Sequence, residues 1–515
     1  MAQGVPAGAL TPAALKQTLM TNYIDFADAG ANSANWAQQY LPDLMEKEAE
    51  IFGNRTISGF LSQVGAEESM SSDQVIWSEQ GRLHISYKDV FLTANGGTAT
   101  VGTLHFNAGT TDVDGNAVTA STAGACPHAV RAGDMILVAD ADSVTRGYVT
   151  SVATSGSGVA NHAVTWKRYD GGNIASGSLA ENQDVTILVY GSEYAKGTIG
   201  RESANKPQFK SRTNKPIILK DKYEISGSDA AQIGWVEVSG EEGQSGYMWY
   251  LKASGDTKAR FNDYLEMAML ESTKAAAATT GAHQGGNFAG TEGLWAALAD
   301  RGNISDALDG SPSHIVALAE FDGIIAELDK QGAIEENMMF VNRNVALNID
   351  DMLAGANGGI GGTVAAPLYG TSYGVFNNDA DMALNLGFSG FRRGSYDFYK
   401  SDFKYLNDAS TRGLINDALT TANTAQITGV MIPAGVSSVY DQNLGKNLKR
   451  PFLHVRYRAS NMESRKYKTW TTGSVGAVTS DLDAMEMHFL SERCLVVQGA
   501  NNFVLLKGLA AGAFN

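Results

Sequence analysis

Alternation of hydrophobic and polar positions is clearest near the end of the chain, in residues 467–508. In the middle of this segment apolar and polar residues alternate, namely Met485, Met487 and Phe489 against Glu486 and His488. A period of two is typical of a strand with one buried face. Glycine and asparagine separate this part from the apolar runs on either side. The pattern predicts three short closing strands.

Short apolar segments also recur between about residues 89 and 200, where charged residues become scarce. Four of them are bounded by turn residues and indicate strands: 128–140, 146–154, 162–172 and 183–191. Regular short strands with glycine turns are typical of a small sandwich or barrel. We therefore expect an inserted β subdomain at about 90–198.

Helical periodicity is strongest in residues 241–275. Glu241 and Glu242 stand near the expected start, where acidic groups oppose the positive end of the helix dipole. The second half carries an apolar stripe made of Phe261, Tyr264, Leu265, Ala268 and Met269. Gly246 and Gly255 weaken the prediction of an unbroken helix. We expect one long helix here.

Helix and strand patterns then alternate over about 286–440. A helical face precedes Gly332 and consists of Ile315, Leu318, Phe321, Ile325 and Leu328. A buried strand is expected at 337–342 and a second helix at 345–353, whereas glycine-rich 354–363 is expected to be a flexible loop.

The first 70 residues are expected to form a helical arm. Thr11 is a typical N-cap and Pro12 follows at the first helical position. A second helical piece is expected at 44–52. Because the arm has few large apolar residues, it should pack on something else.

Composition narrows the class of protein. The chain has 515 residues, of which 43% are hydrophobic and 18% charged, and a net charge of −16. This length can hold two or three cores, and this composition argues against a disordered tail, a coiled coil or a protein that wraps nucleic acid. Two distant cysteines, Cys126 and Cys494, make no disulfide framework or metal site. The sequence shows neither a secretory signal nor a membrane span, so we expect a reduced protein made inside the cell.

Motifs that suggest catalysis or ligand binding are weak. Residues 370–374 match the nucleophile elbow of hydrolases around Ser372, and His454 and His488 follow in the chain. A turn-like segment follows where the elbow needs a helix, so we interpret Ser372 as a loop residue. Asp112–Asn116 resembles the start of a calcium loop but lacks later ligands, which favours a tight turn. We expect no catalytic residue, no cofactor and no metal site, and therefore no enzyme.

The order of these elements is an arm, a long excursion, a long helix, a mixed α/β block, a basic return strand and closing strands. It resembles the Hong Kong 97-like major capsid fold of tailed bacteriophages. The resemblance implies an α+β fold with a spine helix. It implies these parts: N-terminal arm, 1–70; extended loop, 71–225, with the β insert at about 90–198; peripheral domain with the spine helix, 226–285; axial domain, 286–440; closing strands of the peripheral domain, 441–515.

The same resemblance implies a function. The chain would assemble with itself into hexamers and pentamers, forming an icosahedral shell around double-stranded DNA. Scaffold, portal and auxiliary capsid proteins would be further partners, and the packaged DNA would touch the inner face non-specifically. The protein would be made and assembled in the cytoplasm of the bacterial host, would reside in the virion capsid, and would have no membrane partner. The β insert would take the place of a separate decoration protein.

Two basic strips, 201–222 and 446–468, are candidate contacts between subunits. Their candidate residues are Lys206, Lys210, Arg212, Lys215, Lys449, Arg450, Arg456 and Arg458. The alternative interpretation is that these residues are ordinary solvated strand faces.

Other functions also remain open from the sequence. A β-rich surface or virion-decorating binding protein would use the insert as its recognition module, and a hydrolase would use Ser372. Self-assembly distinguishes a shell protein from a binding module.

Overall fold

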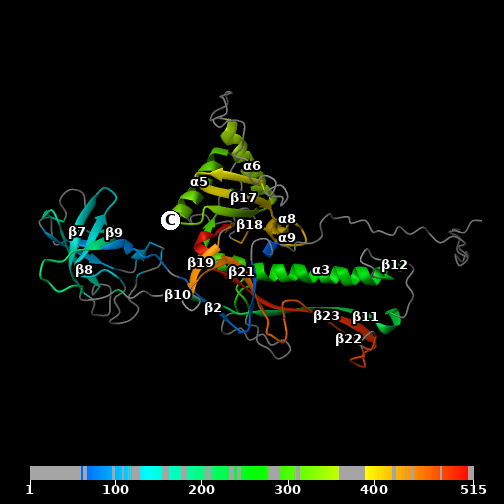
Figure 1. Ribbon diagram of the computed structural model, residues 1–515. Helices are drawn as coiled ribbons and strands as arrows, with labels where there is room; N and C mark the ends of the chain where they lie inside the picture. Colours follow the sequence, from blue (N-terminus) through cyan, green and yellow to red (C-terminus); the bar gives the residue numbers. More distant parts are fainter. Residues whose placement is uncertain are drawn as a thin grey trace, which may run out of the picture. The chain divides into compact units, whose positions relative to one another are not determined.

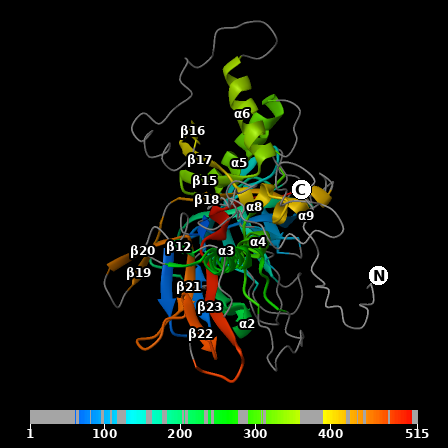
Figure 2. The same cartoon turned by 90° about the vertical axis from the view of Figure 1, so that its right-hand side faces the viewer.

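The computed structural model describes most of residues 60–507 (Figures 1 and 2). Residues 1–59 and 508–515 lie outside the described part, as do several internal segments, of which the longer ones are 119–127, 154–161, 175–181, 276–289 and 359–388. The described residues form helices and strands around separate hydrophobic cores. The α+β class expected from the sequence is confirmed.

The insert contains a closed six-stranded β-barrel, whose strands β7, β8 and β9 are labelled in Figure 1. All neighbouring strands are antiparallel, and β3 pairs with β4 to close the ring. In order around the barrel the strands are β4 (Val101–His105), β8 (Ala163–Arg168), β7 (Val144–Val152), β6 (Asp134–Ala139), β9 (Gln183–Ser192) and β3 (Ser86–Ala94). The short β5 (Thr111–Asp112) pairs with β3 outside the ring. Of the two architectures expected from the sequence, the barrel is correct.

Trp166 fills the barrel interior and is fully buried. Two glycines on neighbouring strands make room for its ring. A Cβ at Gly147 would lie 2.4 Å from the Trp166 ring and equally close to the carbonyl oxygen of Lys167, and a Cβ at Gly102 would lie 2.7 Å from Trp166 Nε1. These glycines are required by close packing, since a core at native density cannot absorb an extra methyl group without strain.

A second, open sheet lies along a long helix. Its strand order is β1 (Ala66–Met70), β21 (Leu453–Arg458), β23 (Ala484–Val497) and β11 (Ile217–Ser226), and β22 (Lys468–Gly473) also pairs with β23. Helix α3 (Met248–Glu271) runs beside β11 and β23 (Figure 1). Phe261 and Leu265 of α3 pack on Phe489 of β23. The strand β11 alternates cleanly, because its odd-numbered residues face the helix and its even-numbered ones are exposed.

The long helix begins at Met248, later than the expected residue 241. Strands β12 (Glu237–Ser239) and β13 (Ser245–Tyr247) pair as an antiparallel hairpin immediately before it, so backbone hydrogen bonds there are taken by a ladder instead of a helix. Glu241 and Glu242 fall in sequence between these two strands and lie outside the described residues. Gly255 does not interrupt the helix.

The expected apolar stripe of this helix is also wrong in one position. Tyr264 is 45% exposed, while Leu270, which was not included, is buried. Leu270 is buried because the C-terminal turn of α3 packs against α4 (Leu294–Arg301) as well as the sheet.

Three strands do form within 467–508, namely β22, β23 and β24 (Val504–Lys507). The middle strand has 14 residues and is not short, and its second half departs from alternation because both faces are buried. Leu495 and Val497 join a core with Leu298 of α4. On the opposite face the Glu492 carboxylate is covered by arginines.

The α/β block contains a six-stranded mixed sheet covered by two helices, α5 (His314–Lys330) and α6 (Arg343–Gly358) (Figure 2). Its strand order is β14 (Asn303–Ser305), β24, β18 (Ile427–Pro433), β15 (Glu336–Val341), β17 (Tyr396–Asp402) and β16 (Ser389–Arg393). Phe321 and Leu328 of α5 are buried as the sequence predicts, and Gly332 follows with a positive φ of 64°. The C-terminal strand β24 lies inside this sheet.

Two further expectations need correction. Residues 66–70 of the expected helical arm are a strand, because they pair in parallel with β21. The glycine-rich segment expected to be a loop from residue 354 is helical as far as Gly358, where α6 ends. The helices expected near Thr11 and at 44–52 lie outside the described residues.

Candidate assembly surface

The first basic strip contributes a two-stranded ribbon, β2 (Val75–Glu79) with β10 (Lys210–Asn214). Arg212 lies on this ribbon with a nitrogen 3.8 Å from Glu79 and another 3.8 Å from Asp300 of α4. Lys215 follows the ribbon and is exposed. Lys210 is part of β10, and Lys206 lies outside the described residues. Arg212 therefore ties the ribbon to its own chain, while Lys215 faces solvent.

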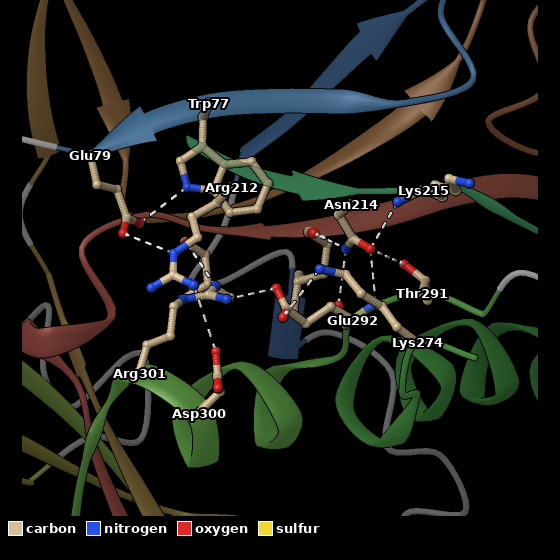
Figure 3. A network of polar contacts seen from close by, with 12 residues as sticks. Trp77, Glu79, Arg212, Asn214, Lys215, Lys274, Thr291, Glu292, Asp300 and Arg301 are labelled. Atoms are coloured by element: carbon tan, nitrogen blue, oxygen red, sulfur yellow. Dashed lines mark hydrogen bonds and ion pairs between the residues drawn. The ribbon is translucent and has the colours of Figure 1, made fainter. Parts of the chain in front are cut away.

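Asn214 is the centre of a buried polar network (Figure 3). Its side-chain amide donates to the carbonyl oxygens of Leu495, at 2.6 Å, and Glu292, at 3.1 Å. Its oxygen accepts from the backbone N–H groups of Glu292 (2.8 Å) and Lys215 (2.9 Å), and from the hydroxyl of Thr291 (3.2 Å). One fully buried amide thus joins the ribbon, the segment before α4 and strand β23.

Arg301 completes the network from the last turn of α4. It forms an ion pair with Glu292 at 3.0 Å, in which both side chains are nearly buried, and its guanidinium lies 5.9 Å from the centroid of the Trp77 ring. Trp77 donates to Glu79 at 3.1 Å, and Glu79 also accepts from the backbone N–H of Gly499 at 3.2 Å. A buried charge is tolerated when it is paired and hydrogen-bonded, and this arrangement satisfies that condition while it fixes the ribbon (Figure 3).

The second basic strip binds the strand β1 to the open sheet. Arg456 pairs with Glu68 at 2.6 Å. Arg458 pairs with Asp73 and, at 3.1 Å, with Glu492. Lys449 and Arg450 belong to β20 (Lys446–Pro451), which forms a hairpin with β19 (Val436–Asp441). Arg456 and Arg458 therefore have acidic partners within their own chain.

The opposite face of the same sheet holds a buried arginine, Arg493. Burial lowers its pKa, against the raising effect of Glu67 and Glu266. Its guanidinium donates to the hydroxyl of Ser491 at 2.9 Å and to the carbonyl of Lys466 at 3.0 Å. Lys466 itself pairs with Glu67 of β1. Cations from β21, β23 and the segment between them thus surround the carboxylates of the N-terminal strand.

A third polar cluster lies at the end of α3. The Glu271 carboxylate accepts from Trp295 Nε1 (3.2 Å), from the Tyr405 hydroxyl (2.7 Å) and from Arg412 (2.5 Å). Burial, then the hydrogen bond to Glu271, raises the pKa of Tyr405. An acidic residue at a helix C-terminus is unfavourable for the dipole, and Arg412 offsets that charge. This cluster links α3 and α4 to α8 (Lys404–Asn407) and α9 (Arg412–Ala418).

The residues of the weak hydrolase and thiol motifs are not brought together in the described part of the chain. Ser372 and Cys126 lie outside it. His454 is buried with Nδ1 3.3 Å from the carbonyl oxygen of Pro451, and His488 contacts the Thr472 hydroxyl at 2.6 Å. Burial raises the pKa of the Cys494 thiol to about 12, which keeps it unreactive at neutral pH.

Ligand-binding features are equally sparse where the structure can be described. The turn expected at Asp112–Asn116 is present, since Gly115 N–H donates to the Asp112 carbonyl at 3.1 Å. Among the described residues no group of three or more His, Cys, Asp or Glu side chains could hold a metal ion. Within those residues no helix has the length and apolar character to cross a bilayer.

Sequence reasoning missed the residues of the central network, Asn214, Glu292 and Arg301. Their only local signal is the Asn-Lys-Pro turn at 214–216, which is typical of a turn and not of a structural centre. Asn214 lies 78 residues from Glu292 and 281 from Leu495 in sequence. Only the folded chain brings them together.

Comparison with known proteins gives matches among solved structures alone. No family model matches the chain, and no curated protein does. The capsid of the native GTA particle, computed with C5 symmetry, is 9% identical over 94% of this chain and 99% of its own, with a TM-score of 0.36. A Microbacterium phage Oxtober96 chain is 9% identical over 90% and 95%, with a TM-score of 0.34. A chain of the cyanophage P-SCSP1u capsid is 10% identical over 63% and 81%, with a TM-score of 0.32. Two of these similar structures are described as capsids.

Proposed function

We propose that this chain is a major capsid protein of a tailed bacteriophage with the Hong Kong 97-like fold. The observation that carries the proposal is the 24-residue helix α3 lying along an open sheet whose strands come from both the middle and the end of the chain. In this assignment α3 is the spine helix, the open sheet belongs to the peripheral domain, and the six-stranded mixed sheet belongs to the axial domain. The chain would have no catalytic activity.

The open sheet is the main physical argument for assembly. Strand β11 forms one edge of the sheet as described, and it is ten residues long, with Ile218 52% exposed and Lys220 and Lys222 beside it. Long exposed edge strands invite pairing with other chains unless they are protected. In a closed shell, neighbouring copies would cover such edges, and the buried area would lie between chains.

The basic strips acquire two different roles in this proposal. Arg212, Arg456 and Arg458 fix the ribbon and β1 within their own chain. Lys215 is exposed at the ribbon's end and is the candidate for contact with a neighbouring copy. Lys206, Lys210, Lys449 and Arg450 remain candidates of the same kind. Such charge pairs would set the register between copies more than the affinity.

The proposed role as a shell protein also implies the partners of this chain. The chain would bind itself in hexamers and pentamers, assemble with scaffold, portal and auxiliary capsid proteins in the host cytoplasm, and enclose double-stranded DNA in the virion. The net charge of −16 is consistent with an inner wall that does not adhere strongly to DNA.

Negative-stain electron microscopy after a sizing column tests the proposal. We expect rings, tubes or icosahedral shells from the full chain, alone or with its scaffold. The variant Lys215→Glu should reduce the yield of assembled particles, whereas Lys196→Glu, the same charge change at another exposed lysine, should not. A strict monomer at high concentration in the presence of scaffold would exclude a shell role and favour a binding module.

A further inference from the structure

The outer wall of the barrel carries four neighbouring tyrosines. Tyr148 lies on β7, Tyr169 follows β8, Tyr190 lies on β9 and Tyr194 follows β9. Tyr169, Tyr190 and Tyr194 are 44%, 45% and 40% exposed, and Tyr148 is partly buried. We call these four residues the tyrosine patch. The barrel core is complete without them, since their rings are absent from the buried cluster inside it.

Small residues let the large side chains lie flat on this wall. On adjacent strands Tyr148 pairs with Met135, and Met135 pairs with Gly191. A Cβ at Gly191 would lie 2.7 Å from the Met135 methyl, so the thioether covers that glycine. A Cβ at Gly133 would lie 2.8 Å from the Tyr194 ring, so this ring lies against the backbone. The result is a broad apolar surface across β9, β6 and β7.

Hydrogen bonds hold two of the rings in place. The Tyr169 hydroxyl donates to Glu193 Oε2 at 2.7 Å, and the Tyr194 hydroxyl donates to the Ala132 carbonyl at 3.4 Å. The rings of Tyr148 and Tyr169 have centroids 5.3 Å apart and are tilted by 50°. Rings fixed before binding lose little conformational entropy when a ligand arrives. The patch is therefore pre-organised for contact.

We propose that the tyrosine patch binds a polysaccharide. The apolar C–H faces of sugar rings would stack on the negative faces of the tyrosines. Sugar hydroxyls would bond to polar groups at the rim: the Glu193 carboxylate, which can accept more than one hydrogen bond, and the exposed Arg146 and Lys167. Lys167 lies next to the patch because it pairs with Tyr148, and Arg146 because it lies two residues before Tyr148 on the same face of β7.

The size of the patch favours a sugar chain over a protein. An aromatic side chain offers about 150–250 Å², so the three exposed tyrosines present roughly 250 Å² of ring surface. A stable protein interface needs about 800 Å² from each partner. A few sugar rings need far less. The patch also does not enclose a quaternary ammonium ion as an aromatic cage would, because the Tyr148 and Tyr169 rings touch each other and leave no gap between them.

Affinity electrophoresis of the full-length protein tests this inference. Native gels would contain soluble dextran, mannan, laminarin, xylan or a bacterial O-chain polysaccharide, and one gel would contain none. We expect retardation in at least one polysaccharide gel. The double variant Tyr169→Ala/Tyr190→Ala should bind about tenfold more weakly, which corresponds to the loss of ring stacking.

Tyr264→Ala is the matched control, since Tyr264 is 45% exposed on α3 and lies outside the patch. It should be retarded like the wild type. If the double variant does not fold, as judged by its melting transition, Tyr190→Ala alone gives the same readout at an exposed ring. The inference is overturned if no polysaccharide retards the wild type or if Tyr264→Ala loses as much binding. It is also overturned if the patch variants keep full retardation and alter only the sizing-column profile, since a protein would then cover the patch.

Discussion

The strands of the barrel and those of the open sheet are held together in different ways. The barrel closes its hydrogen-bond ladder on itself, from β3 round to β4, and its interior is a core of aliphatic and aromatic side chains. The open sheet joins β1, β11, β21 and β23, which are far apart in sequence, and it buries charged groups such as Glu492 and Arg493. The barrel is thus self-contained, whereas the sheet depends on polar and ionic contacts between distant segments.

This difference predicts how far the effect of a destabilising substitution extends through each region. In the barrel every strand pair lies within the insert, whereas β1 and β11 of the sheet pair with strands from the end of the chain, so a local defect in the barrel should stay local. In the sheet one side chain can hold several segments, so its loss should loosen all of them. Within the proposed shell, the region that depends on distant contacts is also the region with open edges. Such a region is suited to adapt to neighbouring copies.

The largest effect is expected at Asn214. Replacing it by alanine should lower the free energy of unfolding by about 3–4 kcal/mol, because buried partners of its amide, including the N–H of Glu292 and the carbonyl of Leu495, would lose their hydrogen bonds. Urea unfolding followed by tryptophan fluorescence measures this change. The exposed Asn461→Ala is the control and should shift stability by less than about 0.5 kcal/mol. Equal effects at the two positions would contradict a central role for Asn214.

A pair of glycine substitutions should change stability in opposite directions. Gly147→Ala should destabilise the barrel by about 2–3 kcal/mol, because the new methyl group would collide with the Trp166 ring and a backbone carbonyl. Gly255→Ala should stabilise by about 0.5–1 kcal/mol, because nothing lies within 4 Å of its Cβ and alanine is favoured inside a helix. Calorimetry of both variants checks the signs. Destabilisation by Gly255→Ala would show that α3 is packed more tightly there than described.

Acid should weaken the barrel through His128. Burial, then the charge of Arg131 and the proximity of His162, lowers the pKa of His128 to about 3 from an ordinary value of 6.5. The unfolded chain therefore binds this proton at a higher pH than the folded chain does. The stabilising contribution of neutral His128 is complete above pH 6.5 and is lost as the pH falls toward 3. The loss in the free energy of unfolding should reach about 2–3 kcal/mol at pH 4.5.

Melting curves at pH 7.5 and pH 4.5 measure this loss. In His128→Phe, which keeps a planar ring stacked on Phe106, the acid-induced loss should shrink. The exposed His84→Phe should leave it unchanged. A wild-type protein equally stable at both pH values would contradict the buried, neutral state of His128.

The smallest effect is expected for the ion pair between Arg456 and Glu68. Its two side chains are partly exposed, so a double-mutant cycle with both alanine variants should give a coupling of about 1 kcal/mol or less. Hydrogen exchange in residues 66–70 should rise in each single variant, since β1 is an edge strand held by this pair. A coupling of zero would contradict the role of Arg456 within its own chain and would make it a candidate again for contact between copies.

Local patterns predicted the local structure of the barrel and of α5. Each of the four segments expected to form strands in the insert contains a barrel strand, and Phe321 and Leu328 face the core. Both results rest on side-chain periodicity, which short-range geometry dictates. The start of α3 was missed because β12 and β13 pair with each other just before it, and no helical pattern reveals a competing ladder. The buried second half of β23 was missed because it is covered on both faces by distant segments, and the local sequence pattern does not indicate which segments these are.

The sequence by itself determined the α+β class and four of the six barrel strands of the insert, since each depends on spacing within about ten residues. Only the tertiary structure decided that the insert closes as a barrel and that Asn214 meets Glu292 and Leu495. It also decided that Tyr169 and Tyr190 lie on one wall. These features depend on which distant segments pack together. Periodicity along a strand shows which face is buried but does not identify the segment that pairs with it.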